Sequence, residues 1–271
     1  MKSFAFVILL FANVHSNAQS VSTLMGARAA GMGYACSTLK DEWAFFNNPG
    51  ALAALEKSSC IFSYEISPSL PGASRIAAGI LLPAKFGVTG LGVFRFGDEL
   101  YSEQIVSGAF SNTFGITSLG VKVNYIQYKA EGTGTKSAAS VSFGGLTLIT
   151  PQILVGAYIV NINQAKISET EQLPTKLTAG LAFKSSEVFL VSTEIEKDIN
   201  YNATWRIGIE YTILKKIFIR TGFNLNPTSV FFGTGCRSRS IILDYSISYN
   251  RVVGTAYQAS ASFQFGKTIK K

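Results

Sequence analysis

Near the C-terminal end of the chain, residues 203–211 read ATWRIGIEY and residues 253–265 read VGTAYQASASFQF. In the first stretch every odd-numbered residue is apolar, whereas the even-numbered residues include Arg206 and Glu210. An alternation of period two is the signature of a β-strand, because successive side chains of an extended chain point to opposite sides. Both stretches therefore predict strands with one apolar face and one polar face.

The same alternation recurs from residue 58 to residue 265 and predicts fourteen strands. Most of these runs are about 9–12 residues long, the length that a tilted strand needs to cross a bilayer, whereas strands of soluble domains are usually about 5–6 residues long. The predicted spans are 58–65, 74–82, 86–96, 101–111, 114–127, 137–148, 152–161, 174–183, 187–196, 202–211, 215–224, 229–236, 239–249 and 253–265.

The connections between these runs alternate in length. Longer ones, such as 66–73 and 162–173, follow odd-numbered strands, and tight turns follow the even-numbered ones, although the last odd connections are short. Outer-membrane barrels have an even number of strands, short periplasmic turns and longer external loops. We therefore predict an all-β fold, a transmembrane antiparallel up-and-down β-barrel formed by residues 58–266. We expect it to lie in the outer membrane, with lipid against its apolar faces.

The first residues have the pattern of a secretory signal peptide. Lys2 precedes a short apolar run at 4–12, and residues 16–18 are small or polar, as a signal peptidase requires. We predict that residues 1–18 are removed on export. A buried N-terminal strand is the alternative.

The composition excludes several classes of protein. Hydrophobic residues make up 47% of the chain and charged residues only 15%, against about 25% charged in a typical soluble domain. The only histidine is His15, which falls in the predicted signal peptide. The mature chain would have no imidazole for a Ser-His-Asp triad or a histidine-ligated metal. We expect no enzymatic activity, no cofactor and no metal site.

The cysteines and the positive charge carry little functional signal. Cys36, Cys60 and Cys236 lack the spacing of a zinc site; a Cys36–Cys60 disulfide is conceivable, but small buried residues are the favoured interpretation. The net charge of +8 comes from scattered lysines and arginines, so we expect no nucleic-acid partner. The basic tail, residues 267–271, is predicted to be solvated.

Residues 19–57, ahead of the first predicted strand, are rich in small residues and turn signals. Because so long an irregular segment has a natural place inside a barrel, we predict an N-terminal lumenal plug. A lone Arg28 in the plug should pair with a lumenal carboxylate, since an unpaired buried charge is costly. The residues singled out in the plug are Gly26, Arg28, Gly31, Gly33, Asn48 and Pro49.

Charged residues at polar-face positions of the later strands form a predicted lumenal row. A turn near residue 213 would place Glu210 opposite Lys216 and Arg206 opposite Arg220, and a turn near residue 200 would place Glu194 opposite Arg206. Two interpretations stay open, a charge ladder that fixes strand register and a polar surface that binds the plug or a ligand head group. The full set is Glu194, Arg206, Glu210, Lys216, Arg220 and Asp244.

The segment 24–53 resembles a known family. Residues 26–35 read GARAAGMGYA and residues 45–53 read FFNNPGALA, which is similar to the N-terminal signature of the PorV/PorQ proteins, themselves similar to the FadL long-chain fatty-acid transporters. The resemblance implies a plug followed by a fourteen-stranded outer-membrane barrel. It also implies a non-catalytic accessory of type IX protein secretion or surface assembly, with secretion-system subunits or cargo as partners.

Two other functions are compatible with the same fold. The first is FadL-like passive transport of hydrophobic small molecules, in which the partner is a hydrophobic ligand. The second is a lipid-modifying outer-membrane enzyme, which the lack of histidine in the mature chain disfavours because such enzymes usually need a general base.

Overall fold

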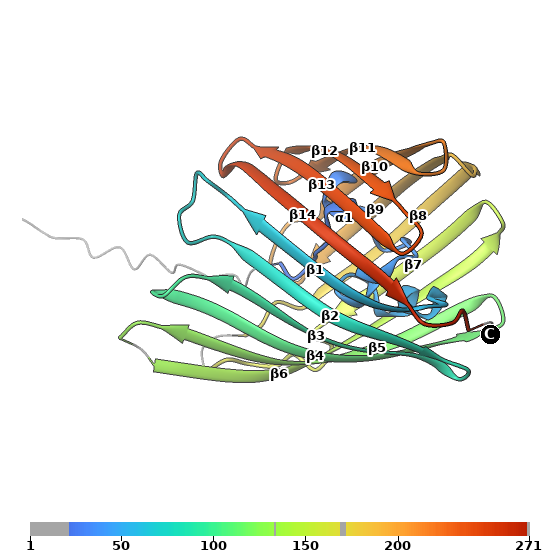
Figure 1. The fold of residues 1–271 in the computed structure, drawn as a ribbon. Coiled ribbons are helices and arrows are strands. Elements are labelled where there is room, and N and C mark those ends of the chain that lie inside the picture. The colour runs from blue at the N-terminus through green and yellow to red at the C-terminus, as the bar shows by residue number, and fades with distance from the viewer. Residues whose placement is uncertain (1–21, 133, 169–171, 270–271) are drawn as a thin grey trace, which may run out of the picture.

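The computed structural model describes residues 22–132, 134–168 and 172–269. Fourteen antiparallel strands form one closed barrel, in which each strand pairs with its neighbours in sequence and β1 pairs with β14 (Figure 1). The strands are β1 Ser58–Ile66, β2 Arg75–Ala84, β3 Gly87–Gly97, β4 Tyr101–Phe114, β5 Thr117–Ala130, β6 Gly134–Thr150, β7 Ile153–Val160, β8 Lys176–Ser186, β9 Phe189–Asp198, β10 Thr204–Ile213, β11 Ile217–Leu225, β12 Ser229–Arg237, β13 Ile241–Asn250 and β14 Gly254–Phe265. The predicted all-β up-and-down barrel is confirmed.

The strand boundaries differ from the predicted ones by at most three residues. The largest extension is in β6, which starts at Gly134 where the alternation indicated residue 137. The predicted signal peptide, residues 1–18, and the last two lysines of the tail lie outside the described residues. The last strand ends at Phe265.

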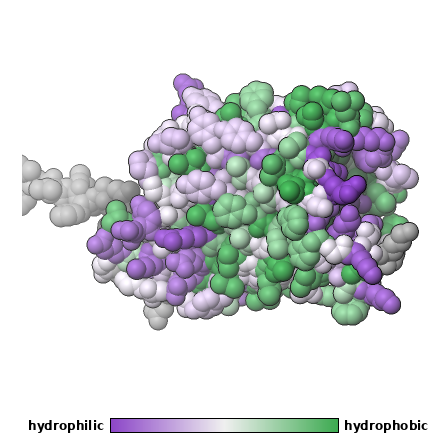
Figure 2. Space-filling model, in the orientation of Figure 1, coloured by the Kyte–Doolittle hydropathy of each residue, from purple (hydrophilic) through white to green (hydrophobic). Residues whose placement is uncertain are grey.

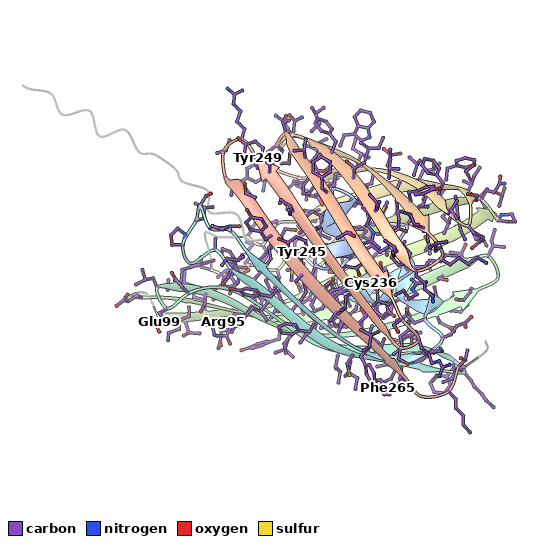
Figure 3. The ribbon with its side chains drawn as sticks, turned by 45° about the horizontal axis from the view of Figure 1, so that its top comes forward. Arg95, Glu99, Cys236, Tyr245, Tyr249 and Phe265 are labelled. Carbon is purple, nitrogen blue, oxygen red and sulfur yellow. The ribbon has the colours of Figure 1, made fainter. Side chains whose placement is uncertain are left out.

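Apolar side chains cover the outside of the barrel and polar side chains point inward. Trp205 and Phe232 are 54% and 62% exposed, whereas inward-facing Ser63 and Gln258 are buried. Figure 2 shows the result as a hydrophobic band between two hydrophilic ends. Tyr245 of β13, labelled in Figure 3, is one of these exposed side chains. Closure of the sheet leaves no row of unpaired backbone groups facing lipid.

Residues 22–57, here called the N-terminal segment, lie inside the barrel and are almost entirely buried. The segment contains α1 (Ala27–Gly31) and two 3-10 helices, η1 (Glu42–Phe45) and η2 (Pro49–Ala54). The Asn48 side chain caps η2 by accepting a hydrogen bond from the Gly50 N–H, which follows from a proline at the first helical position preceded by an N-cap asparagine. None of the helices in the described ranges is long and apolar enough to cross a membrane.

Cysteine placement rules out the conceivable disulfide. Cys36 is buried in the N-terminal segment, whereas Cys60 is exposed on the outside of β1, and both are free. Burial raises the pKa of the Cys36 thiol well above its ordinary value. The favoured interpretation, a small buried residue, holds for Cys36 and fails for Cys60 and Cys236, which are exposed.

The strand register corrects one part of the predicted lumenal row. Glu210 pairs with Arg220, not with Lys216, and Arg206 pairs with Asn224, not with Arg220. The turn after β10 is centred near Lys215, two residues beyond the predicted turn, so Lys216 lies in the turn and is exposed. Leu214 and Lys215 both adopt positive φ angles there, a conformation that no Gly or Asn in the sequence signals. The predicted pairing of Glu194 with Arg206 is confirmed.

Candidate functional site in the lumen

The N-terminal segment is joined to the barrel by a buried ion-pair network. Arg28 donates from Nε and Nη2 to the two carboxylate oxygens of Glu210, at 2.8 and 2.6 Å, and from Nη1 to Asp41 at 3.1 Å. A two-point pairing of this kind fixes the orientation of both groups. Burial alone would lower the pKa of the Arg28 guanidinium, but the charges of Glu210 and Asp41 outweigh it and raise that pKa above its ordinary value.

The network continues across the sheet through Arg220. Its Nε donates to Glu210 at 2.6 Å and its Nη1 donates to Asp244 at 2.7 Å. Asp244 lies on β13, so the second bond passes over β12. Gly235 of β12 makes this possible, because a Cβ atom there would overlap the Asp244 carboxylate. The sequence placed Asp244 two strands beyond Arg220, and the structure brings the two into contact.

A second ion-pair group lies closer to the external end of the same wall. Arg206 donates to Glu194 at 2.8 Å and pairs with Glu196 at 3.0 Å. Glu194 also accepts the backbone N–H groups of Cys36 and Ser37, at 2.9 and 2.8 Å. Five of the six residues of the predicted row therefore lie in two networks that touch the N-terminal segment, and Lys216 is the exception.

The glycines and turn residues singled out in the segment lie at its closest approaches to the barrel wall or to itself. Gly26 packs on Trp43, Gly31 on Gly233 of β12, and Gly33 on Asn224 of β11. The Asn48 side-chain amide donates to the carbonyls of Ser37 and Gly145, at 2.6 and 3.0 Å. Pro49 lies over Gly120 of β5, where any Cβ atom would overlap the Pro49 carbonyl group.

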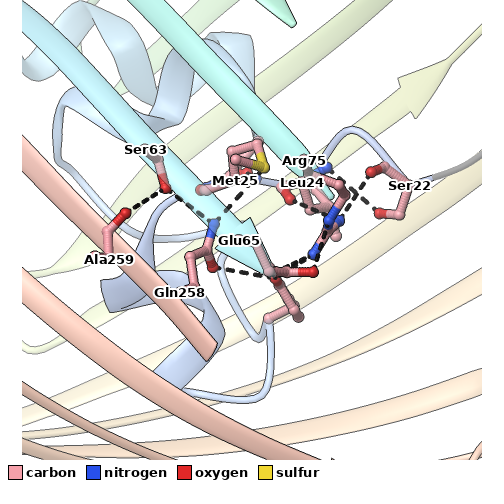
Figure 4. Close-up of polar contacts among 10 residues, drawn as sticks. Ser22, Leu24, Met25, Ser63, Glu65, Arg75, Gln258 and Ala259 are labelled. Carbon is pink, nitrogen blue, oxygen red and sulfur yellow. Dashed lines mark hydrogen bonds and ion pairs between the residues drawn. The ribbon is translucent and has the colours of Figure 1, made fainter. Parts of the chain in front are cut away.

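A third polar cluster, at the external end of β1 and β2, was not predicted. Arg75 pairs with Glu65 and donates to the Tyr34 hydroxyl at 2.8 Å and to the Ser22 carbonyl at 3.0 Å (Figure 4). Gln258 of β14 accepts from the Tyr34 hydroxyl at 3.3 Å. Glu65 and Arg75 flank one connection at the ends of adjacent strands, a sequence signal that could have identified the pair.

The opposite wall of the lumen carries the main apolar cluster of the protein. Phe45, Phe46 and Leu52 of the N-terminal segment pack against inward-facing aliphatic and aromatic side chains of β1 to β7. Lys122 is a buried cation on this wall, and its Nζ donates to the Phe46 carbonyl at 2.9 Å. The barrel residues of the cluster include Ile61, Leu81, Val88, Phe94, Ile105, Ile126, Leu146 and Leu154.

A cavity of about 70 Å³ lies between the N-terminal segment and this apolar wall. Most of its lining is apolar, contributed by Leu24, Phe46, Ile105, Ile126, Tyr158, Val160, Leu173 and Pro174. The Tyr158 hydroxyl is buried without a hydrogen-bond partner among the described residues. Ser22, Lys176 and Glu196 line both this cavity and a polar vestibule of about 410 Å³ at the external end. The cavity is thus adjacent to the external vestibule.

No protein-family model and no curated protein sequence matches the chain. Solved structures do match it. The monoaromatic hydrocarbon channel CymD superposes with a TM-score of 0.76 at 14% identity, covering 91% of this chain and 99% of the channel. The Pseudomonas putida toluene transporter TodX gives 0.70 at 12% identity, covering 91% and 100%. A Pseudomonas aeruginosa FadL homologue gives 0.64 at 12% identity, also covering 91% and 100%.

At these identities the likeness establishes the fold alone. Strand number, closure, the apolar outer band and these superpositions agree with one another. The chain therefore has the FadL-like fold of a fourteen-stranded outer-membrane β-barrel.

Proposed function

We propose that this barrel is a non-catalytic channel that admits small hydrophobic molecules from outside the cell. The observation that carries the proposal is the mainly apolar cavity between the N-terminal segment and β4 to β7, which shares Ser22, Lys176 and Glu196 with the external vestibule. An apolar molecule that enters such a cavity is removed from water, which is favourable in proportion to the apolar area buried. The similar solved structures are described as hydrocarbon channels and a toluene transporter, which supports the same ligand class.

The N-terminal segment acts as the plug of this channel. Leu24 and Phe46 of the segment line the cavity, so a ligand bound there contacts the segment directly. An apolar cavity of about 150 Å³ holds a benzene molecule, about twice the volume present here. A monocyclic ligand must therefore extend into the vestibule or move Phe46, and either event couples ligand binding to the plug.

Trp43 provides a direct test of binding. Its ring stacks on Phe46 at a centroid distance of 6.1 Å, and Trp205, the other tryptophan of the chain, faces outward. In a Trp205→Phe background, toluene should change the Trp43 emission in a saturable manner. Ile126→Phe combined with Val160→Phe, which fills the cavity, should weaken this response about tenfold or more, equivalent to about 1.4 kcal/mol.

The matched control is Val121→Phe combined with Val123→Phe, which adds the same groups to the outer face of β5. The control should bind toluene like the parent protein, and cells producing it should accumulate radiolabelled toluene at the parent rate. Equal binding by all three proteins, or accumulation that does not depend on the cavity, would exclude the channel proposal.

A second candidate is a PorV/PorQ-type accessory of type IX secretion or surface assembly. It is favoured by the N-terminal sequence signature, whose residues 26–35 and 45–53 include several that pack closely against glycines of the barrel wall. Co-purification from the native outer membrane distinguishes the candidates. Secretion subunits or cargo would support the accessory role, and bound lipid or hydrocarbon would support the channel.

A further inference from the structure

The periplasmic end of the barrel is strongly basic. In the up-and-down topology, the turns after even-numbered strands and the two ends of the barrel sequence all meet at this end. Only Glu56 and Glu187 are acidic among its exposed or half-buried described residues. The basic ones are Lys40, Lys57, Lys85, Lys184, Lys215, Lys216, Arg237, Arg239 and Lys267.

Part of this charge lines a third cavity, here called the periplasmic vestibule. It has a volume of about 410 Å³ and lies between the N-terminal segment and the periplasmic ends of β7 to β12. Its charged lining consists of five basic residues and two acidic ones, an excess of three positive charges. Those residues are Arg28, Lys40, Lys184, Lys215, Arg237, Glu187 and Glu210.

Three of the cations in the vestibule are not neutralised. Lys40, Lys215 and Arg237 form no ion pair in the part of the chain that the structure describes, whereas Arg28 is held by Glu210, and Lys184 is bonded to Glu187 at 2.8 Å. Burial and, after it, the charge of Lys184 lower the pKa of Lys40. Like charges held together in a partly enclosed space raise the local concentration of anions.

The remaining lining consists of three hydroxyl residues, Thr38, Ser186 and Thr212, and of six apolar residues, Leu39, Leu154, Val188, Phe189, Leu190 and Phe218. The vestibule thus offers separated cations above an apolar floor. A single small carboxylate would neutralise only one of the three unpaired cations. Thr38 and Leu39 of the N-terminal segment contribute to the lining, so part of this surface lies inside the ring of strands.

We propose that the periplasmic vestibule is a docking site for an acidic, partly apolar segment of a periplasmic protein. The acidic side chains would pair with Lys40, Lys215 and Arg237, and the apolar ones would cover the floor between the turns after β8 and β10. Charge complementarity supplies the recognition and accelerates the encounter. The inference does not depend on what passes through the external cavity.

The test uses the full-length protein in nanodiscs of a zwitterionic lipid and a short fluorescein-labelled peptide in which glutamate and leucine alternate. Fluorescence anisotropy should show saturable binding that weakens with salt, and a peptide with glutamine in place of glutamate should not bind. The vestibule variant, Lys40→Gln with Lys215→Gln and Arg237→Gln, should bind about tenfold more weakly or worse. Heat-modifiable mobility on a denaturing gel verifies that each variant is folded.

The control variant, Lys57→Gln with Lys85→Gln and Lys267→Gln, removes the same charge from the same end but outside the vestibule. It should keep its affinity within about twofold. Equal losses in the two variants would mean that the peptide responds to overall charge, and no loss in either would mean that it binds elsewhere. Both results overturn the proposal without bearing on toluene binding.

Discussion

The two walls of the lumen hold the same N-terminal segment by different physics. On the β9 to β13 wall, Arg28 and the backbone at Cys36 are fixed by charge-assisted hydrogen bonds to carboxylates of the barrel. On the β1 to β7 wall, Phe45 and Phe46 are held mainly by packing, and the polar contacts are fewer, among them the bonds from Arg75 to the Ser22 carbonyl and the Tyr34 hydroxyl. The charged wall specifies one register and one orientation, because ion pairs are directional. The apolar wall stabilises the segment by burying apolar surface, an interaction that does not depend on direction. The cavity in which a hydrophobic ligand would fit lies on this side.

The largest effect is expected at the centre of the charged wall. Arg220→Met leaves Asp244 buried without its cation and should lower the free energy of unfolding by about 3–5 kcal/mol, because Arg220 is 2% exposed and bonds both Glu210 and Asp244. Urea unfolding in lipid measures this. Lys216→Met, in the exposed turn, should stay within about 0.5 kcal/mol of the parent.

The same site offers a sharper form of the comparison. Arg220→Met combined with Asp244→Leu also removes the unpaired Asp244 carboxylate. The free energy of unfolding should therefore partly recover relative to Arg220→Met alone. If the double variant is less stable than the single one, the loss of stability in Arg220→Met comes from packing and not from an unpaired charge. The two walls would then be stabilised by the same kind of interaction.

On the apolar wall, Phe45→Ala should cost about 3 kcal/mol, because the ring is fully buried. Gly92→Ala alone should also destabilise, since its Cβ would lie 2.5 Å from the Phe45 ring. Combined, the two changes should cost less than their sum, because the new methyl group occupies space that the ring has left. Strict additivity in this cycle would mean that Phe45 does not contact β3.

Arg28→Ala should have a moderate effect, about 2 kcal/mol, confined to the docking of the N-terminal segment. Glu210 keeps Arg220 as a partner, so the barrel itself retains its ion pair. Limited proteolysis should therefore cleave the segment sooner while the barrel remains heat-modifiable. An unchanged rate of cleavage would show that Arg28 does not anchor the segment.

The smallest effect is expected at Lys122, a buried cation on the wall that carries the apolar cluster. Lys122 is buried, and its charge has no carboxylate within ion-pair distance among the described residues. Lys122→Met should therefore be neutral or stabilise the protein by up to about 1 kcal/mol. A loss comparable to that of Arg220→Met would mean that the two walls do not differ as described.

The strands were readable from the sequence because each one carries its own alternation. The pairing of Glu194 with Arg206 followed from one correctly placed turn, whereas Glu210 was assigned to Lys216 because Leu214 and Lys215 turn without Gly, Asn or Pro. The apolar wall could not be predicted in this way. Ile105 and Ile126 face inward and belong to the same cluster as Phe45 and Phe46, and local alternation holds no information about packing against a segment that is distant in sequence.

The central claim is that the N-terminal segment lies in the lumen against both walls. Its most direct test is disulfide trapping of Thr38→Cys with Ser192→Cys, in a background where the native cysteines are serines. The two hydroxyl oxygens lie 3.2 Å apart, so the folded protein should form this disulfide almost completely on mild oxidation. Thr38→Cys with Ile195→Cys, whose second residue faces outward, should not form it. Absence of the first disulfide, or equal yields of the two, would contradict the account.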